Sequence, residues 1–331
     1  MEDFISTAVN VTANRGNSLI NRKMIFRILG VLLFMEAIMF LVCAGVSLCY
    51  GEADYLYFIY TTLINVAVGS ILLLLGKGAE NRVTRRDGYC IVAFTWLLFT
   101  GFGMLPFYIS GSIPSVADAF FETMSGFTTT GATILDDIES LSHGMLFWRS
   151  FSQWIGGLGI VFFTIAVLPI FGVGNQVLFS AEATGVTHDK IHPKISIMAK
   201  WLWTVYLILT VVETVLLLLG GMDLFDAVCH AFSTTATGGY STKQDSVAYW
   251  NSPFIEYVIA IFMVLSGVNF SLYFMCMTGR VKHLFKDEEF RLYLISIGAV
   301  TLLITGALYW HNHYGLEEAF RKSLFQVASG H

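Results

Sequence analysis

Seven apolar stretches, each long enough to cross a bilayer as a helix, dominate this chain of 331 residues. Hydrophobic residues make up 55% of the sequence and charged residues only 13%, which leaves little material for a water-soluble domain. A hydrocarbon core of about 30 Å requires roughly 20 apolar residues in an α-helix. The sequence therefore predicts an all-α, polytopic protein of the lipid bilayer with no nucleic-acid partner. The predicted spans are approximately residues 24–49, 54–76, 88–110, 144–171, 195–220, 251–278 and 290–311.

Basic residues are concentrated in alternate loops between these spans. Fifteen of the 19 lysines and arginines fall on one side of the predicted membrane. Cytoplasmic loops carry such an excess, so we expect residues 1–23 to form a cytoplasmic tail and the C-terminal end to lie outside. The fifteen are Arg15, Arg22, Lys23 and Arg27; Lys77, Arg82, Arg85 and Arg86; Lys190, Lys194 and Lys200; and Arg280, Lys282, Lys286 and Arg291.

Two loops on the opposite side are too apolar to be solvated and too short to cross the membrane twice. In the first, at 111–143, residues 117–127 carry apolar side chains at helical spacing and predict a short re-entrant helix. The same arrangement of a short helix and a polar segment recurs at 222–250, and its first part appears again at 315–329. A unit of helix, re-entrant helix, polar segment and helix thus repeats along the chain.

A Thr/Gly run follows each of the first two re-entrant helices, and we pair Gly131 of the first run with Gly238 of the second. Irregular backbone at membrane depth is tolerated only inside protein or beside a water-filled cavity. Successive carbonyls and hydroxyls can replace the hydration shell of a cation, and neither run holds the carboxylate that a divalent ion would favour. We therefore predict a filter for a monovalent cation. Its candidate residues are Thr128, Thr129, Thr130, Gly131, Thr235, Ala236, Thr237 and Gly238.

Several polar residues lie inside the predicted spans, where they are costly and are often functional. Glu213 fits either the ion path or a structural hydrogen bond, and Asn269 could line the cavity. For Glu36 we favour a contact between helices. Arg149, near an outer helix end, would snorkel to the interface or pair with a loop carboxylate. The run GGLG at residues 156–159 indicates close helix packing or a bend rather than a phosphate loop.

Three segments resemble the Trk/Ktr potassium uptake family: GFTTTGAT at residues 126–133, SQWIGGLG at 152–159 and AFSTTATGG at 231–239. The resemblance extends from about residue 20 to the end of the chain. It implies a single pore built from four repeats, a homodimer in the bacterial plasma (inner) membrane, and a cytosolic nucleotide-binding regulatory subunit (TrkA/KtrA-like). It also implies that carbonyls of Thr129, Thr130, Ala236 and Thr237 coordinate the transported potassium ion. Glycine rather than serine at position 131 favours potassium over sodium by the same resemblance.

The resemblance divides the chain into an extra two-helix unit at 24–87, a first repeat at 88–171, a linker with the second repeat at 172–278, and a third repeat begun at 279–331. Its third filter glycine would fall near position 335, beyond His331. We therefore expect a C-terminally truncated chain that carries two filters of four and does not transport by itself.

Two alternatives remain at this point. The same scaffold could be selective for sodium or for mixed monovalent cations. A different class of function, a membrane-embedded enzyme, would have to use Glu213 or His230. We expect no enzymatic activity and no organic cofactor, because no supported catalytic pairing emerges from the sequence, and we expect His230 to pack or to form hydrogen bonds.

Overall fold

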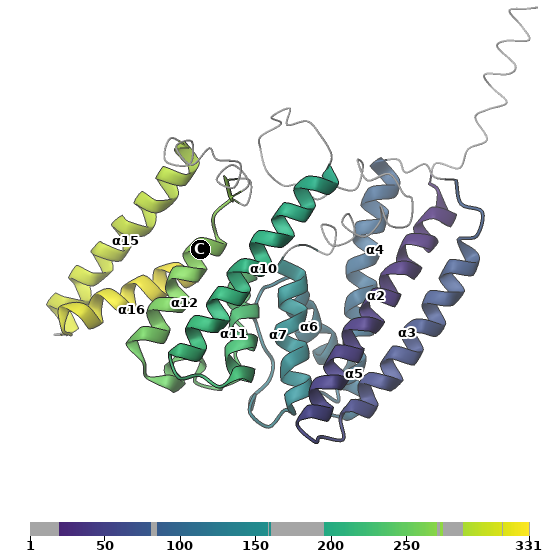
Figure 1. Cartoon of the computed structure of the whole chain (residues 1–331), viewed down its shortest axis with the longest axis horizontal. Coiled ribbons are helices and arrows are strands. Elements are labelled where there is room, and N and C mark those ends of the chain that lie inside the picture. Colours follow the sequence, from purple (N-terminus) through teal and green to yellow (C-terminus); the bar gives the residue numbers. More distant parts are fainter. Residues whose placement is uncertain are drawn as a thin grey trace, which may run out of the picture.

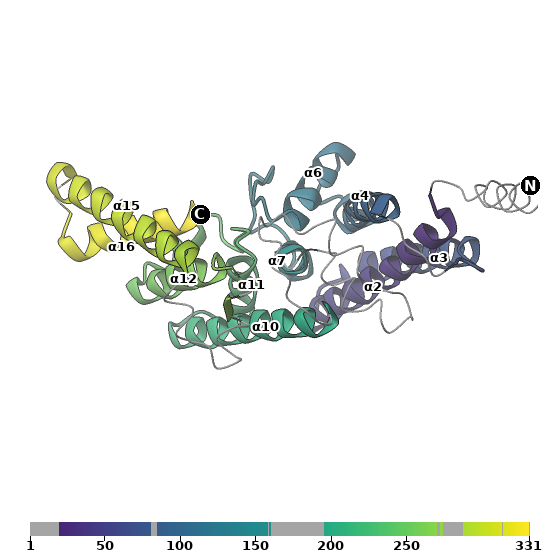
Figure 2. The same ribbon diagram turned by 90° about the horizontal axis from the view of Figure 1, so that it is seen from above.

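The computed structural model describes residues 20–80, 85–157, 159, 195–269, 272–273, 287–312 and 314–330, and every regular element in these ranges is a helix. The helices stand in a row, with α2 and α3 at one end of the molecule and α15 at the other (Figures 1 and 2). They are α2 (Arg22–Cys49), α3 (Tyr55–Leu75), α4 (Arg85–Gly103), α5 (Leu105–Ser110), α6 (Val116–Phe127), α7 (His143–Gly157), α10 (Ile195–Leu219), α11 (Leu224–Thr235), the 3-10 helix η3 (Ser246–Trp250), α12 (Pro253–Ser266), α15 (Glu288–Asn312) and α16 (Leu316–Ser329).

Five of the seven predicted spans are confirmed as helices long and apolar enough to cross a membrane. They are α2, α3, the joined α4 and α5, most of α10, and α15. The other two predicted spans, 144–171 and 251–278, begin as α7 and α12, and their later parts lie largely outside the described residues. The described part of the chain is therefore that of a multi-pass membrane protein.

Helices α2 and α3 pack closely because two glycines face each other at their crossing. A Cβ atom added to Gly30 would lie 2.9 Å from the carbonyl oxygen of Gly69, and one added to Gly69 would lie 3.1 Å from that of Gly30. Small residues let membrane helices approach in this way. Further along, the buried carboxylate of Glu36 accepts a hydrogen bond from Asn65 Nδ2 at 3.0 Å. This bond confirms the predicted helix-to-helix contact of Glu36.

The third predicted span is broken between α4 and α5, just before Pro106. A proline has no N–H, so the turn cannot complete its bond to the carbonyl of Phe102. At this break the carbonyl of Gly103 accepts a hydrogen bond from the indole Nε1 of Trp148 on α7 at 2.9 Å. A side chain from the helix that follows the first re-entrant segment thus supports the break.

The three short helices that the sequence predicts are present as α6, α11 and α16, and their re-entrant position in a membrane stays a prediction. The first two begin at side-chain caps, where Ser115 Oγ accepts from the N–H of Asp118 and Asp223 Oδ1 from that of Asp226. Helix α16 runs from the far end of α15 back to α12 (Figure 1).

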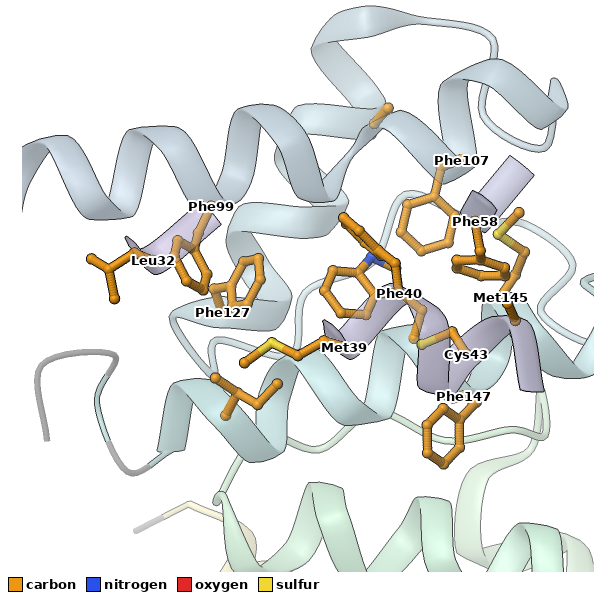
Figure 3. Close-up of a cluster of buried hydrophobic side chains, with 14 of the residues drawn as sticks. Leu32, Met39, Phe40, Cys43, Phe58, Phe99, Phe107, Phe127, Met145 and Phe147 are labelled. Atoms are coloured by element: carbon orange, nitrogen blue, oxygen red, sulfur yellow. The ribbon is translucent and has the colours of Figure 1, made fainter. Parts of the chain in front are cut away.

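One hydrophobic core joins the N-terminal pair to the first repeat (Figure 3). The fully buried Phe127, the last residue of α6, packs edge-on against Phe99 of α4 and Trp148 of α7, with ring centroids 5.6 and 5.8 Å away. Phe40 of α2 also packs against Trp148, with ring centroids 4.7 Å apart. The residue that leads into the first Thr/Gly run is therefore held between α4 and α7.

Replacing Gly30 with leucine tests the glycine crossing. We expect Gly30→Leu to lower the melting temperature of the purified protein, because overpacking of this kind costs about 1–3 kcal/mol. Gly45→Leu is the matched control, since it lies on the same helix and a Cβ there meets nothing within 4 Å. Equal melting temperatures for the two variants would show that the crossing is not tight.

Candidate cation site between two repeated loops

The two Thr/Gly runs follow helices of equal length and adopt the same backbone structure. Helices α6 and α11 are each 12 residues long, so that Val116 corresponds to Leu224 and Phe127 to Thr235. We call residues 128–133 loop 1 and residues 236–241 loop 2. The predicted pairing of Gly131 with Gly238 is corrected by one position, because the positive-φ glycine of loop 2 is Gly239. The register follows from aligning the ends of the two helices, and not from matching residue types at single positions.

Both loops begin as a Schellman motif, in which two N–H groups beyond a helix bond back to carbonyls of its last turn. In loop 1, the N–H groups of Thr129 and Thr130 donate to the carbonyls of Gly126 and Ser125, each at 3.0 Å. The equivalent bonds in loop 2 run from Thr237 to Thr234 at 2.9 Å and from Gly238 to Ser233 at 2.8 Å.

A threonine occupies the left-handed position of each motif, where glycine is usual. The φ angles of Thr129 and Thr237 are 53° and 55°. For a β-branched residue this conformation is a genuine outlier, and such strain costs about 1–3 kcal/mol. Strain of this kind persists where function needs it and neighbours enforce it. The predicted filter therefore contains one strained threonine in each loop.

The loops touch each other directly at a glycine. Gly131 has a φ of 74°, and a Cβ added to it would lie 2.0 Å from the carbonyl oxygen of Gly238. No side chain fits in that space. Glycine at 131 is thus required by both its backbone conformation and its neighbour.

Helix α7 ends against both loops through a pair of glycines. A Cβ on Gly156 would lie 1.9 Å from the carbonyl oxygen of Phe127, just before loop 1, and one on Gly157 would lie 2.7 Å from Cα of Ala236 in loop 2. The close-packing interpretation of residues 156–159 is confirmed for these two glycines, and the helix ends at Gly157. Leu158 lies outside the described residues.

A buried ion pair lies behind loop 1. Arg149 of α7 donates from Nε to Oε1 of Glu122 on α6 at 2.9 Å, and the two residues are only 2% and 1% exposed. The carboxylate also accepts from Thr133 Oγ1 and from the N–H of Ile134, both at 3.0 Å. The predicted pairing of Arg149 with a carboxylate is thus observed, but with a carboxylate of the re-entrant helix instead of an outer loop.

The same arginine reaches loop 2. Its Nη1 donates to the carbonyl oxygen of Ser241 at 3.1 Å, and its guanidinium lies 4.2 Å from the ring centroid of Tyr240. The Tyr240 hydroxyl in turn donates to the backbone carbonyl of Glu122 at 2.8 Å. Arg149, Glu122 and Tyr240 therefore connect the far ends of the two loops.

His230 occupies in α11 the place that Glu122 occupies in α6, since each is the seventh residue of its helix. Glu122 bonds to the hydroxyl of Thr133, and His230 Nε2 lies 3.0 Å from the hydroxyl of Ser241, which is the counterpart of Thr133. The other ring nitrogen of His230 lies 2.8 Å from the carbonyl oxygen of Asp226. Each side chain anchors the end of its own loop, which agrees with the predicted hydrogen-bonding role of His230.

Glu213 and Asn269, the other two predicted candidates, do not lie where the two loops meet. Glu213 of α10 is fully buried behind α11, where it accepts a hydrogen bond from Thr235 Oγ1 at 3.3 Å. Asn269 is exposed just beyond α12. Neither is among the described residues that line the cavity beside the loops. This geometry favours the structural interpretation of Glu213.

A cavity of about 340 Å³ lies beside the two loops. Its walls include Gly131 of loop 1, Thr237 and Gly239 of loop 2, and the C-terminal ends of α11 and α16. Helix C-termini carry partial negative charge and stabilise a nearby cation. Residues of both loops and the ends of two helices therefore border one cavity, beside apolar residues of α12 and α16. Backbone carbonyls of such loops would suit a weakly hydrated cation.

Sequence reasoning missed four residues that build this site: Glu122, Gln153, Gly239 and Tyr240. Gln153 bonds to the backbone of loop 2 on both sides of Gly239. A signal for the ion pair was present, because Glu122 and Arg149 are opposite charges in neighbouring apolar segments. Tyr240 gave no such signal, since its partners lie on the preceding repeat.

Removing Arg149 tests the ion pair. We expect Arg149→Met to destabilise the protein by about 3–5 kcal/mol, because it leaves the Glu122 carboxylate buried without its cation. Lys322→Met is the control, since it breaks an exposed pair with Glu318, and such pairs contribute about 0–1 kcal/mol. Thermal unfolding of the purified proteins measures both, and similar losses would contradict a structural role for the buried pair.

The chain is similar to a known protein family, to known proteins and to a solved structure. The family model described as "TrkH: Cation transport protein" matches residues 57–310. Among similar proteins, the Trk system potassium uptake proteins TrkH and TrkG of Escherichia coli (strain K12) are 38% and 34% identical to it, over 93% of this chain and 64% of theirs. The crystal structure of the potassium transporter TrkH from Vibrio parahaemolyticus superposes with a TM-score of 0.80 at 34% identity, with the same coverage.

The chain therefore spans 64% of the length of the relatives it matches. The family model covers well over half of the chain, and the repeated loops lie within the matched residues. The chain belongs to the TrkH family of cation transport proteins.

Proposed function

We propose that this chain forms part of the potassium pathway of a Trk-type uptake system. The observation that carries the proposal is the pair of loops, alike in backbone structure, that meet at Gly131 and border one cavity. The relatives named above as potassium uptake proteins support the choice of ion. In the proposed mechanism, the ion exchanges part of its water shell for backbone carbonyls of residues 128–131, 235–237 and 239 and moves down its electrochemical gradient.

The proposal also covers the membrane, the topology and the subunits of the protein. It places the protein in the bacterial inner membrane with a cytoplasmic N-terminus, as a homodimer that binds a cytosolic nucleotide-binding subunit. The division into a two-helix unit (24–87) and repeats (88–171, 172–278 and 279–331) belongs to the same proposal. Support comes from the distribution of basic residues and from the names of the relatives, which describe components of a Trk system.

The enzyme alternative finds no support in the geometry of its candidate residues. Glu213 bonds to Thr235 behind the pore helix, and the ring nitrogens of His230 lie at hydrogen-bond distance from Ser241 and Asp226. Glu213 thus contacts the hydroxyl of the last residue of α11, and His230 contacts the hydroxyl of the last residue of loop 2. The sodium alternative is tested by competition: sodium that permeates as well as rubidium through the full-length protein would exclude potassium selectivity.

Gly131→Ala tests the contact between the loops. In cells that lack other potassium uptake and express the full-length protein, we expect rubidium uptake to fall by at least about tenfold, because the new Cβ would displace the ligand backbone. Gly111→Ala is the matched control: Gly111 has nearly the same φ, 77°, but a Cβ there meets nothing within 4 Å. Uptake that is unchanged in the Gly131 variant would contradict the proposed filter.

Thr129→Gly separates strain from function. We expect an unchanged or higher melting temperature, because glycine avoids a left-handed penalty of about 1–2 kcal/mol. Rubidium uptake should nevertheless fall, since glycine leaves the carbonyl free to turn away. Asn251→Gly is the control, because Asn251 also has positive φ, 43°, and lies outside both loops. Full uptake by the Thr129 variant would show that the strained threonine has no part in conduction.

A further inference from the structure

The inference concerns Gln153, a buried residue of α7 that contacts loop 2 from behind. Its Nε2 donates to the carbonyl oxygen of Gly238 at 2.9 Å, and its Oε1 accepts from the N–H of Tyr240 at 3.1 Å. The side chain is fully buried, so no water competes for these groups. A single amide group thus holds loop 2 on both sides of Gly239.

These two bonds determine the orientation of two peptide planes. The carbonyl of Gly238 belongs to the plane that joins residues 238 and 239, and the N–H of Tyr240 to the plane that joins 239 and 240. Peptide groups are planar, so each bond fixes a whole plane. Gly239, with a φ of 81°, is the flexible residue between them, and it cannot rotate while both bonds hold.

The direction of the carbonyls follows from this geometry. The Gly238 carbonyl oxygen accepts the bond from Gln153 of α7 and lies against Gly131, so these two neighbours compete with an ion for it, although Gly238 also borders the cavity. In a trans peptide the C=O and N–H groups point in opposite directions. Because the N–H of Tyr240 points at Gln153, the carbonyl of Gly239 points away from α7. Gly239 is one of the residues that line the cavity.

We propose that Gln153 is the positioning residue for loop 2, turning the Gly238 carbonyl away from the cavity and the Gly239 carbonyl toward it as an ion ligand. The inference rests on the proposed cation pathway and deepens it. It makes Gly239 the counterpart of Gly131 in function as well as in register. It also makes the first repeat, through α7, responsible for selectivity at the second loop.

Two substitutions test this role. Gln153→Met keeps the length of the side chain and removes both bonds. Gln153→Glu keeps an acceptor for the Tyr240 N–H and replaces the amide donor that binds Gly238. The readout is the ratio of rubidium to sodium uptake, measured in proteoliposomes that contain the full-length protein. A ratio does not depend on how much protein is inserted, so it separates selectivity from folding.

We expect the ratio to fall by at least about tenfold in Gln153→Met, and by less in Gln153→Glu, because one of the two peptide planes is still held. Gln244→Met is the matched control. Gln244 also accepts a backbone N–H, that of Ile138 at 3.1 Å, but it is exposed in the outer loop, and its loss should leave the ratio unchanged.

The outcomes separate the two proposals. A wild-type protein that takes up no rubidium contradicts the potassium pathway itself. A selective wild type whose Gln153 variants keep the wild-type ratio, even with a lower melting temperature, overturns the positioning role and leaves the pathway intact. If Gln153→Met does not insert, the isosteric Gln153→Glu decides by the same ratio.

Discussion

The buried pair of Glu122 and Arg149 is the interaction on which the arrangement of the two loops depends. Two charges removed from water are stable only when their remaining donors and acceptors are also satisfied. Here the partners that satisfy them are the loops themselves: Thr133 and Ile134 of the first segment and Ser241 of the second. The pair and the loops therefore require each other, because moving either loop would leave a charge without a partner in a buried site.

The repeat conserves the shape of the loops but not the chemistry of their support. At equivalent places, a carboxylate in α6 and the imidazole of His230 in α11 bind equivalent hydroxyls. The carboxylate is paired with Arg149, whereas His230 lies at hydrogen-bond distance from the carbonyl of Asp226. A backbone structure can be reproduced with different side chains because the Schellman bonds are made by the main chain. Different supports can then hold the two loops with different stiffness.

The sequence was sufficient to predict the membrane class, five complete spans and the three short helices α6, α11 and α16, because apolar length and period are local properties. For the ion ligands it points to the two Thr/Gly runs, since such runs between apolar helices have few other uses at membrane depth. It misplaced the register by one position, because Gly238 and Gly239 are alike in sequence and differ only in φ and in their partners. The role of Gln153 could not be predicted for a related reason: its two hydrogen bonds join residues that are 85 and 87 positions apart in the sequence.

The strained threonines explain why so much support is concentrated behind the loops. A left-handed threonine would relax to an ordinary conformation if its segment were free, since the strain of about 1–3 kcal/mol opposes the observed one. Around Thr237, relaxation is blocked by α7: Gly157 packs against Ala236 on one side, and Gln153 holds Gly238 on the other. Gly156 holds the residue before loop 1 in the same way. One helix end thus packs against both loops, and its Gln153 also bonds to the backbone of loop 2 on both sides of Gly239.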